Sequence, residues 1–534
     1  MIFKSPFPDV EIPNLSLPDY LMRETASYGS RQALIDGPSG RSYTYDQLRE
    51  YIRRTAAGLQ ARGFGKGQTT AIYSPNVPEY AFAFFGTALA GGTCTTANPL
   101  YTPGELAFQI KDAGARLLVT VPPLLEAARA AAELAAAEGQ KVDEIFVFGE
   151  APGATPFAAL LATDPATLRP VAIDPAEDVI ALPYSSGTTG KPKGVMLTHR
   201  NLVANICQTH DLDEVDDHET LIGVLPFFHS YGMTVIQAAS LSRGSTVITM
   251  PRFDLEEFCR LIQDHKVTIG YVVPPILVGL AKHPNVSNYD LSSLKFLNSG
   301  AAPLGLDLAQ AVKNRLHCVV KQGYGLTETS PVTHTSPYPG RIKVDTVGVS
   351  IPNTECKIID IVSGKELGPN EQGELYIRGP QVMKGYLNNR EATDECLSAD
   401  GWLRTGDVAT VDEEGYYRIH DRLKEFIKYK GFQVAPAELE DYLMGHPAIA
   451  DAAVVPSPDE EAGEVPKGFI VLKPEARRAK SDQELIEDIQ AYIAAKVAPH
   501  KKLRRVEFVD QIPKSASGKI LRRVLVEQER AARR

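Results

Sequence analysis

The sequence predicts an α/β fold. A large N-terminal domain of mixed and parallel sheets flanked by helices, with a β-rich subdomain, is followed by a small mobile α+β C-terminal domain. In the first two-thirds of the chain, short apolar runs alternate with segments of helical spacing, which is typical of parallel sheets covered by helices. From about Glu355, paired short runs flank turn-rich stretches, as in β-hairpins. After Asp421 a shorter series of helices and strands begins, long enough for a separate domain.

The early elements follow from periodicity. Apolar residues at helical spacing predict helices over residues 45–62 and 79–90, and alanine content favours a helix over 124–137. Compact apolar runs predict strands at 69–73 and 117–121. The apolar part of the second helix is too short to cross a membrane, which takes about 20 residues.

Three later strands end in small residues. They cover residues 179–183, 294–297 and 318–321, and each runs directly into a stretch containing serine or glycine. Small residues permit close backbone approach, and ligands of open α/β sheets bind beyond the carboxyl ends of the strands. These three loops are therefore candidates to converge on one pocket.

The remaining elements are hairpins and then an α+β unit. Strand pairs are expected at 356–361 with 374–377 and at 408–411 with 416–419. Proline opens a helix over 436–444, and Ser481 caps a helix that runs to about residue 497 through a capping box. Strands are expected at 465–472 and 506–509. We divide the chain into an N-terminal domain (1–421), a hinge (422–424) and a C-terminal domain (425–534).

Composition limits the function classes. The chain has 534 residues, is 43% hydrophobic and 23% charged, and carries a formal net charge of −10, which excludes a whole-protein electrostatic nucleic-acid binder. The six cysteines form no C-x-x-C pair, so reduced, buried thiols are expected. The first residues lack the pattern of a signal peptide, and the last two are Arg-Arg rather than a peroxisomal address. A cytoplasmic protein, a monomer or weak homodimer, is expected.

The strongest local signal is the run S-S-G-T-T-G-K-P-K-G at residues 185–194. Hydroxyls, two lysines and backbone amides exposed by glycine suit a polyphosphate. A flexible surface loop is the alternative, but apolar runs on both sides tie the segment to buried strands. A Walker loop is excluded, because Gly187 and Gly190 are too close and Pro192 stands where a Mg²⁺-binding hydroxyl would be needed.

Four stretches carry a resemblance to a known family: residues 182–199, 322–331, 421–440 and 513–523. In the content and order of these motifs, the chain resembles the adenylate-forming superfamily, which includes acyl-CoA synthetases, firefly-type luciferases and nonribosomal peptide adenylation domains. Within it, the chain is most similar to 4-coumarate–CoA ligases. The resemblance implies an ATP-dependent ligase that uses Mg²⁺, turns a carboxylic acid into an acyl-adenylate, and passes the acyl group to coenzyme A.

The resemblance also implies a nucleotide site. Tyr324 stacks on adenine, Thr327 contacts the α-phosphate, Asp407 and Arg422 hold the ribose, and Glu328 binds Mg²⁺, with Thr188 as a second candidate ligand. Without that context, the Gly-Tyr-Gly segment would be an ordinary turn and the aspartate a solvated residue. The full expected ATP/AMP-binding set is Ser185, Ser186, Gly187, Thr188, Thr189, Gly190, Lys191, Gln322, Gly323, Tyr324, Thr327, Asp407 and Arg422.

An acyl pocket is implied around His229. A lone histidine beside aromatic residues is more often part of a core, but the resemblance makes it a residue that positions the carboxylate and later gates thiol entry. The family often has tyrosine where Phe228 stands and glycine where Ala301 stands. The expected lining is Phe228, Gly232, Ala301, Gly325, Pro331 and Val332, whereas Trp402 is expected only to pack.

Lys519 follows a Ser/Gly turn near the end of the chain. A lysine in a basic tail is usually solvated. Adenylation, however, presses a carboxylate against an α-phosphate, and a unit charge pair at 4 Å is worth about 4 kcal/mol at an effective dielectric near 20. A mobile ammonium between the two anions offsets that repulsion. The resemblance identifies Lys519 as the family's catalytic lysine.

The second half-reaction involves other residues of the small domain. Lys424 matches the hinge; Lys428, Lys430 and Gly431 match coenzyme A-binding positions; Lys428 and Gln433 match residues used for thioester formation. The small domain would present Lys519 first and then rotate to present another face.

Aryl-propenoic acids such as 4-coumarate are the favoured substrates, and medium- or long-chain fatty acids are the alternative. A luciferase-like oxidase shares the first half-reaction and is disfavoured. A non-catalytic sensor is also disfavoured, because Lys519, Glu328 and Asp407 are all present. No nucleic acid and no membrane span is expected.

Overall fold

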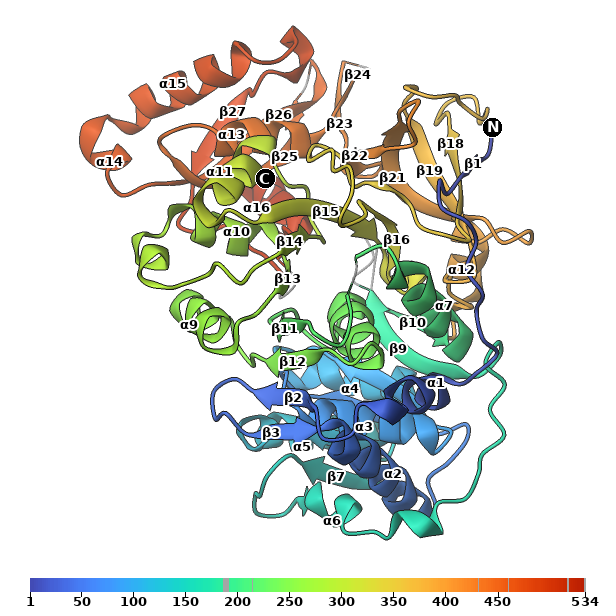
Figure 1. Cartoon of the computed structure of the whole chain (residues 1–534). Helices are drawn as coiled ribbons and strands as arrows, with labels where there is room; N and C mark the ends of the chain where they lie inside the picture. The colour runs from blue at the N-terminus through green and yellow to red at the C-terminus, as the bar shows by residue number, and fades with distance from the viewer. Residues whose placement is uncertain (186–191, 214, 431, 460, 516–517, 533–534) are drawn as a thin grey trace.

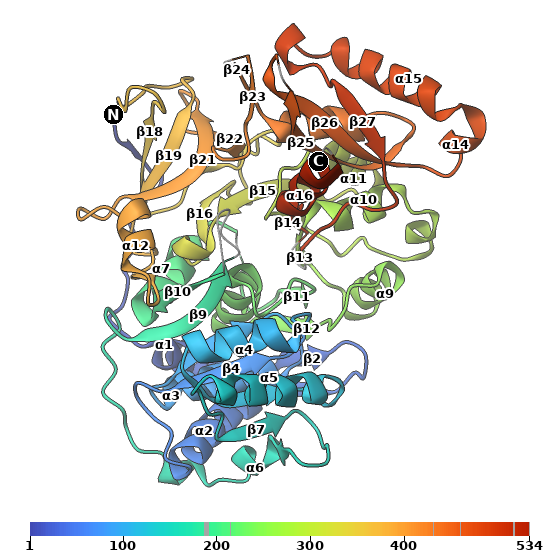
Figure 2. The same ribbon diagram turned by 180° about the vertical axis from the view of Figure 1, so that it is seen from behind.

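The computed structural model describes the chain except residues 186–191, 214, 431, 460, 516–517 and 533–534. The described strands form four sheets. Three of them build the larger part of the molecule, and the fourth, with the helices that follow residue 435, forms a cap at one end (Figure 1). The reverse view shows that α16 (Arg522–Ala532) lies on the side of this cap that faces the larger part (Figure 2).

The first large sheet has the strand order β20-β10-β9-β5-β4-β6-β7-β8. Successive side chains of its strand β4 (Thr69–Tyr73) belong alternately to two hydrophobic cores. Ile72 joins the main core with residues of α2 and α3, whereas Ala71 and Tyr73 join a separate cluster with α4 and α5. The bounds are β5 Thr93–Ala97, β6 Ala115–Thr120, β7 Glu144–Val147, β8 Thr155–Pro156, β9 Val179–Ser185, β10 Lys193–Thr198, β20 Gly385–Tyr386, α2 Tyr45–Ala61, α3 Glu79–Leu89, α4 Pro103–Asp112 and α5 Leu125–Ala137.

The second large sheet has the order β17-β16-β15-β14-β13-β11-β12-β2-β3. Strands β14 (Phe296–Ser299) and β15 (Val319–Gly325) are parallel neighbours, so two of the three predicted loops leave the same edge. The third strand, β9, belongs to the first sheet. The other bounds are β2 Gln32–Asp36, β3 Ser42–Thr44, β11 Thr220–Gly223, β12 Thr246–Thr249, β13 Ile269–Val272, β16 Val332–Thr335, β17 Val349–Ser350, α1 Leu17–Glu24, α7 His199–His210, α9 Leu255–His265, α10 Pro274–Lys282 and α11 Leu306–Leu316.

A smaller antiparallel sheet, β1-β18-β19-β21-β22, contains both predicted hairpins. Asp407 lies within β21 rather than at a strand edge. Trp402 packs as expected, with the ammonium of Lys357 4.5 Å and the guanidinium of Arg378 4.6 Å from its ring centre. The bounds are β1 Phe3–Lys4, β18 Glu355–Ile359, β19 Gly373–Arg378, β21 Leu403–Val411, β22 Tyr417–Arg422 and α12 Arg390–Cys396.

The C-terminal sheet has the order β24-β23-β26-β25, and β27 (Arg505–Phe508) pairs with β26. The predicted helix 436–444 is α13 (Pro436–Met444), and the Ser481 capping box opens α15 (Asp482–Ala494). Strand β25 (Ile449–Asp459) was not predicted, because Pro456 and Pro458 interrupt its pattern; an edge strand tolerates them. The other bounds are β23 Ile427–Tyr429, β24 Phe432–Val434, β26 Gly463–Leu472 and α14 Ala476–Ala479.

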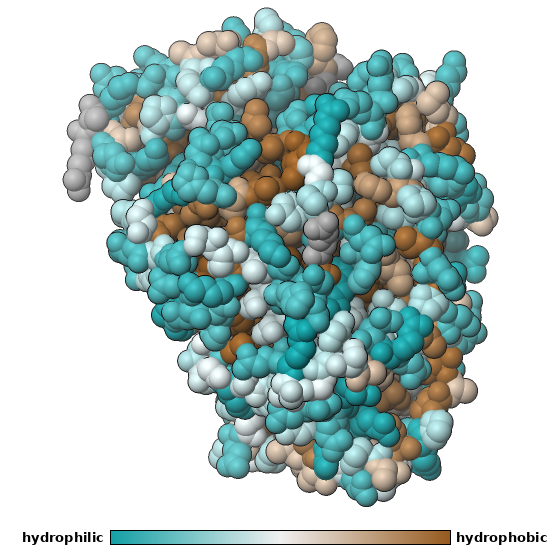
Figure 3. Space-filling view, in the orientation of Figure 1, coloured by the Kyte–Doolittle hydropathy of each residue, from teal (hydrophilic) through white to brown (hydrophobic). Residues whose placement is uncertain are grey.

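Most buried clusters lie within one part of the molecule, although Val408 of the larger part packs with Phe426 and Ala435 of the C-terminal part. The main core contains residues only from the larger part, whereas the clusters around Leu439 and around Phe469 belong to the C-terminal part. Hydrophilic residues cover most of the face seen in Figure 3, and the hydrophobic ones gather chiefly near the middle, below the C-terminal part. All six cysteines are free; four are buried as expected, whereas Cys207 and Cys396 are only half-buried. Within the described residues, no helix is both long and apolar enough to span a membrane.

Candidate active site

The predicted phosphate loop connects two paired strands. Ser185 at the end of β9 lies opposite Lys193 at the start of β10, so the hairpin fixes both ends of the loop. Among the described residues, the buried Ser185 hydroxyl has no hydrogen-bond partner, which suits a donor that awaits a ligand oxygen. The predictions for Ser186, Gly187, Thr188, Thr189, Gly190 and Lys191 lie outside the described residues.

Glu328 lies beside this hairpin. Tyr386, in the strand that pairs with β10, donates its hydroxyl to Glu328 Oε1 (2.8 Å), and the amide of Met383 donates to the Glu328 carbonyl (2.8 Å). The Lys193 ammonium lies 4.4 Å from the Tyr386 ring centre. A carboxylate is therefore held next to the phosphate loop. Nothing in the sequence pattern indicated the part that Tyr386 plays, because it is 58 residues away along the chain.

Mg²⁺ is compatible with this arrangement. In the described part of the chain, no three His, Cys, Asp or Glu side chains cluster as a metal cage. Mg²⁺ does not need such a cage, because it is usually bound through one or two carboxylates plus substrate phosphates and waters. Glu328 beside a phosphate loop supplies that kind of donor set.

Tyr324, Asp407 and Arg422 form one polar group. The Tyr324 hydroxyl donates to Asp407 Oδ2, and Arg422 Nε lies 3.5 Å from Asp407 Oδ1. Asp407 and Arg422 are also register partners in neighbouring strands. Burial raises the pKa of the Asp407 carboxyl, whereas Arg422 and the Tyr324 hydroxyl favour its ionised form. The three predicted nucleotide residues are therefore brought together.

Three further residues predicted to bind the nucleotide are Gln322, Gly323 and Thr327, and their surroundings differ from those of Tyr324 and Asp407. The Gln322 amide is used for structure: Nε2 donates to the carbonyls of Val344 (2.7 Å) and Leu304 (3.3 Å), and Oε1 accepts from the Leu304 amide (3.2 Å). A nucleotide could meet this residue only through its backbone. Thr327 begins a short 3₁₀ turn directly after β15, next to Glu328.

His229 is a neutral imidazole at neutral pH. The Tyr231 amide donates to its Nδ1 (3.2 Å). Burial, assisted by the positive charge of Lys519, lowers the pKa of His229 to about 3. The ring therefore hydrogen-bonds without carrying charge.

The predicted acyl residues lie where the backbone is crowded. A Cβ on Gly232 would meet the Pro226 carbonyl oxygen at 2.1 Å, and a Cβ on Gly325 would meet that of Pro331 at 1.9 Å. Ala301 has φ +68°, a left-handed conformation that favours glycine. The Phe228 carbonyl accepts from Thr96 Oγ1 (2.7 Å), and the Val332 amide donates to Asn205 (3.0 Å).

Tyr231 and Asn298 lie beside these residues and were not predicted. The side-chain Nδ2 of Asn298 donates to the Tyr231 hydroxyl (3.1 Å), and this hydroxyl donates to the backbone carbonyl of Asn298 (3.2 Å). A Cβ on Gly300 would lie 2.7 Å from the Tyr231 ring, and one on Gly323 would lie 3.4 Å from the Asn298 amide nitrogen. These glycines leave room next to a polar pair.

Lys519 reaches this group from the C-terminal part. Burial and Arg422 lower the pKa of its ammonium, whereas Asp407, Glu328 and Glu425 act in the opposite direction, so the side chain lies within electrostatic range of the nucleotide residues. The neighbouring Gly518 packs on Val273, to which a Cβ would come within 3.3 Å. In this pose the predicted catalytic lysine faces the site.

The predicted coenzyme A residues do not join the site in this pose. Lys428 and Lys430 belong to the β23–β24 hairpin at the edge of the C-terminal sheet, near the top of Figure 1. The ammonium of Lys430 pairs with Glu461, and the Lys428 amide donates to Glu464 (2.8 Å). Gly431 lies outside the described residues, as does the side chain of Gln433.

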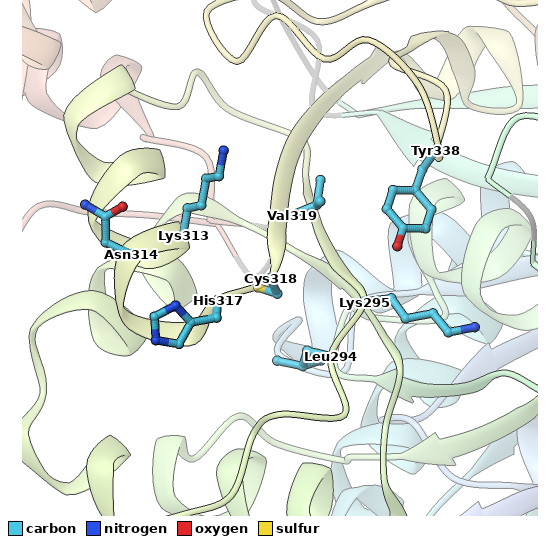
Figure 4. A pocket seen from close by; sticks show the side chains of 8 residues that line it. All are labelled: Leu294, Lys295, Lys313, Asn314, His317, Cys318, Val319 and Tyr338. Carbon is cyan, nitrogen blue, oxygen red and sulfur yellow. The ribbon is translucent and has the colours of Figure 1, made fainter.

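A surface depression of about 710 Å³ lies at the opposite ends of the strands. It is lined at the starts of β14 and β15 by Lys295, His317 and Cys318, and Tyr338 lies on the same side as Lys295, away from His317 (Figure 4). The site residues follow the carboxyl ends of these strands, so this depression is not part of the candidate site.

Comparisons with known proteins agree with the geometry. Residues 21–387 match the model of the AMP-binding enzyme family, and residues 438–519 match that of the AMP-binding enzyme C-terminal domain. The chain is 44% identical to 4-coumarate–CoA ligase 3 of Oryza sativa subsp. japonica (98% of this chain, 94% of that protein) and 42% identical to 4-coumarate–CoA ligase of Pinus taeda (98% and 97%). Its fold is similar to that of the anthranilate CoA ligase AuaEII in complex with anthranoyl-AMP, with a TM-score of 0.89, 26% identity and 98% of each chain covered.

Proposed function

The chain belongs to the AMP-binding enzyme family, and on that premise we propose that its site joins a carboxylic acid to coenzyme A through an acyl-adenylate. The protein is an ATP-dependent acid–CoA ligase of the 4-coumarate–CoA ligase type. The observation that carries the proposal is the position of Lys519 in electrostatic range of Asp407, Glu328 and His229, groups contributed by three separate segments of the larger part.

In the first half-reaction, a substrate carboxylate oxygen attacks the α-phosphorus of ATP, and pyrophosphate leaves. Asp407 and Arg422 hold the ribose, Tyr324 covers the adenine, and the loop at 185–191 binds the phosphates. The Lys519 ammonium lies between the carboxylate and the α-phosphate and offsets their repulsion. Glu328 would hold Mg²⁺, which neutralises phosphate charge when bound. Neutral His229 hydrogen-bonds the carboxyl group without competing for the role of the lysine.

In the second half-reaction, the thiol of coenzyme A attacks the acyl carbonyl, and AMP leaves. We assign the hinge to Lys424 within residues 422–424, between domains 1–421 and 425–534. Rotation there would withdraw Lys519 and bring in the β23–β24 hairpin, with Lys428, Lys430, Gly431 and Gln433. The adenylate is already activated, so no side chain need form a covalent bond.

Aryl-propenoic acids are the proposed substrates. The Tyr231–Asn298 pair beside Gly300 and Gly323 supports an acid with a hydrogen-bonding group, because a purely aliphatic chain would leave Asn298 Oδ1 without a partner. Asn298 Oδ1 is buried and, among the described residues, has no hydrogen-bond partner.

A panel of acids tests the proposal. AMP release is measured with and without coenzyme A for 4-coumarate, cinnamate and a series of fatty acids. Coenzyme A-dependent AMP release is expected with aryl-propenoic acids, and 4-coumarate is expected to exceed cinnamate. Preference for fatty acids would contradict the substrate assignment, and the absence of acyl-CoA with every acid would contradict the ligase activity.

A further inference from the structure

Residues 513–515 pair with residues 518–521, and we call this paired segment, which carries Lys519, the Lys519 hairpin. Lys514 and Ile520 pair as an antiparallel bridge, and the Ser515 amide donates to the Lys519 carbonyl (2.8 Å). The Lys519 amide donates in return to Ser515 Oγ (3.1 Å). The backbone of Lys519 is therefore fixed within the hairpin, and the direction of its ammonium depends on how the hairpin is anchored at its two ends.

Each end of the hairpin carries an ion pair. On one side, the Lys514 ammonium lies 2.6 Å from Asp451 of β25. On the other side, Arg522 Nη2 donates to Glu440 Oε2 (2.8 Å), and Arg522 Nε lies 3.0 Å from Glu425 Oε2. The Arg522 side chain is 12% exposed and that of Glu440 13%, so this pair is shielded from solvent.

The Arg522 anchor joins three elements of the C-terminal part. Arg522 opens α16, Glu440 belongs to α13, and Glu440 Oε1 accepts from the Val454 amide of β25 (2.7 Å). Both carboxylate oxygens of Glu440 are therefore used. Burial raises the pKa of Glu440 to about 7, even though Arg522 and the Val454 amide lower it, so this carboxylate depends on its cation to stay ionised.

Glu425 connects this anchor with the site. It follows the proposed hinge directly, and its amide donates to the Arg422 carbonyl (2.9 Å). Its carboxylate is close enough to influence the ionisation of Lys519, Arg422 and Asp407. Because Arg522 pairs with Glu425, it is connected to the segment that lies near the Lys519 ammonium.

We propose that Arg522 is a positioning residue for adenylation: by pairing with Glu425 and Glu440 it holds the Lys519 hairpin so that the Lys519 ammonium points into the nucleotide site. This inference rests on the proposed function. Arg522 does not touch the reacting atoms and acts through Lys519. A displacement of about 1 Å at a reacting group can cost as much as 10²-fold in rate, so a small tilt of the hairpin suffices to slow the reaction.

The next residue provides a matched control. Arg523 carries the same charge, is 70% exposed, and pairs only with Glu527 one helical turn away, among the contacts of the described residues. Replacing Arg523 changes the charge of the helix but not the anchor. Comparison of Arg522→Gln with Arg523→Gln therefore separates the buried contacts from simple loss of charge.

The test measures the two half-reactions separately in the full-length enzyme. Adenylation is followed by acid-dependent ATP–pyrophosphate exchange, and thioester formation by reaction of pre-formed acyl-AMP with coenzyme A. Arg522→Gln is expected to slow exchange by ~10- to 10²-fold and to leave thioester formation within about twofold, because Lys519 serves only the first step. Arg522→Lys should restore part of the loss, and Arg523→Gln should match wild type.

Two results would overturn the inference while the wild-type enzyme is active: unchanged exchange in Arg522→Gln, or an equal loss in both half-reactions, which indicates a structural role. If Arg522→Gln does not fold, Glu425→Gln decides, since it removes one contact of the same anchor and should show the same selective loss at smaller size. Lack of exchange in the wild-type enzyme with every acid would instead refute the proposed function itself.

Discussion

Several charged groups near Lys519 influence the ionisation of its ammonium. Three carboxylates (Asp407, Glu328 and Glu425) favour its ammonium, whereas burial and Arg422 disfavour it. When ATP and a carboxylic acid bind, the negative charge in the site rises further. The ammonium is therefore stabilised most when both substrates are present, which is the state in which the proposed mechanism uses it.

We predict that Lys519→Ala lowers adenylation by at least ~10²-fold, comparable to the loss of one donor that stabilises a developing charge. ATP–pyrophosphate exchange measures this step. Reaction of pre-formed acyl-AMP with coenzyme A should barely change, because in the proposed mechanism the lysine leaves the site before thiol attack. Near-normal exchange in the variant would rule out the role assigned to this lysine.

Asp407 should control the affinity for ATP. Its side chain is 6% exposed, accepts from Tyr324 and pairs with Arg422. We predict that Asp407→Asn raises KM for ATP by ~10- to 10²-fold, since a hydrogen bond to a charged group is worth about 1.5–3 kcal/mol. KM for the acid should change much less. The exposed Glu413→Gln, in the next turn of the same sheet, is the control, and equal changes in both KM values would argue against a ribose contact.

At the scale of elements, local patterns predicted fewer than half of the strands and helices that the structure describes. Strand 69–73 and helix 436–444 have the predicted bounds, because their periodicity and their proline or apolar content are local properties. The pairing of strands was harder to predict from the sequence. The sequence pattern does not indicate that β9, which leads into the loop at 185–191, pairs with β5 and β10 in a different sheet from β14 and β15. Such pairing depends on contacts between distant segments.

The same contrast between local patterns and contacts of distant segments applies to the candidate site. The family resemblance, carried by contiguous motifs, indicated Tyr324, Glu328, Asp407 and Lys519 as functional candidates. The groups that hold them were not indicated, because Tyr386 meets Glu328, and Glu440 meets Arg522, only in the folded chain. No local pattern distinguishes such a supporting residue from an ordinary surface tyrosine or glutamate.

The β15–β16 turn should be intolerant of substitution. A Cβ on Gly325 would lie 1.9 Å from the Pro331 carbonyl oxygen, a backbone atom that cannot move aside. We predict that Gly325→Ala destabilises the protein by about 1–3 kcal/mol, as overpacking does, and displaces Tyr324 and the acyl pocket together. Thermal unfolding and the KM values for ATP and acid measure both effects.

The control for this substitution is Gly104→Ala. Gly104 lies in the first turn of α4, where a Cβ would meet no other atom of the described residues within 4 Å. Alanine there should be neutral or stabilising by up to about 1 kcal/mol, because helix propensity improves. If the two variants had the same Tm and the same kinetics, the crowding at Gly325 would not constrain the pocket.

At the scale of the whole molecule, the two parts are packed closely in this pose. A Cβ on Gly305, which caps α11 of the larger part, would lie 2.0 Å from Asp441 Oδ1 of α13. Across the same boundary, burial and the like charge of Lys473 lower the pKa of Lys282. This pose therefore combines close packing with repulsion between two cations, and the second half-reaction as proposed needs a different pose.

Buried histidines should make the larger part sensitive to acid. Burial lowers the pKa of His199 to about 4 and that of His334 to about 3, and both rings are almost inaccessible. Below pH 6.5 these two histidines become protonated in the unfolded chain but stay neutral in the folded chain. The free energy of unfolding therefore falls as pH falls. Each of these histidines should contribute about 2 kcal/mol to the loss of stability between about pH 7 and pH 5.

We predict that His334→Gln reduces the difference in unfolding free energy between about pH 7 and pH 5 by about 2 kcal/mol. Urea unfolding followed by the fluorescence of Trp402, the single tryptophan, reports on the part of the molecule that contains this histidine. His218→Gln is the matched control, because its ring is 79% exposed and its replacement should leave the wild-type difference intact. If His334→Gln retained the full difference, protonation of this ring would not be what destabilises the protein in acid, and the loss would have to arise from other groups such as His199.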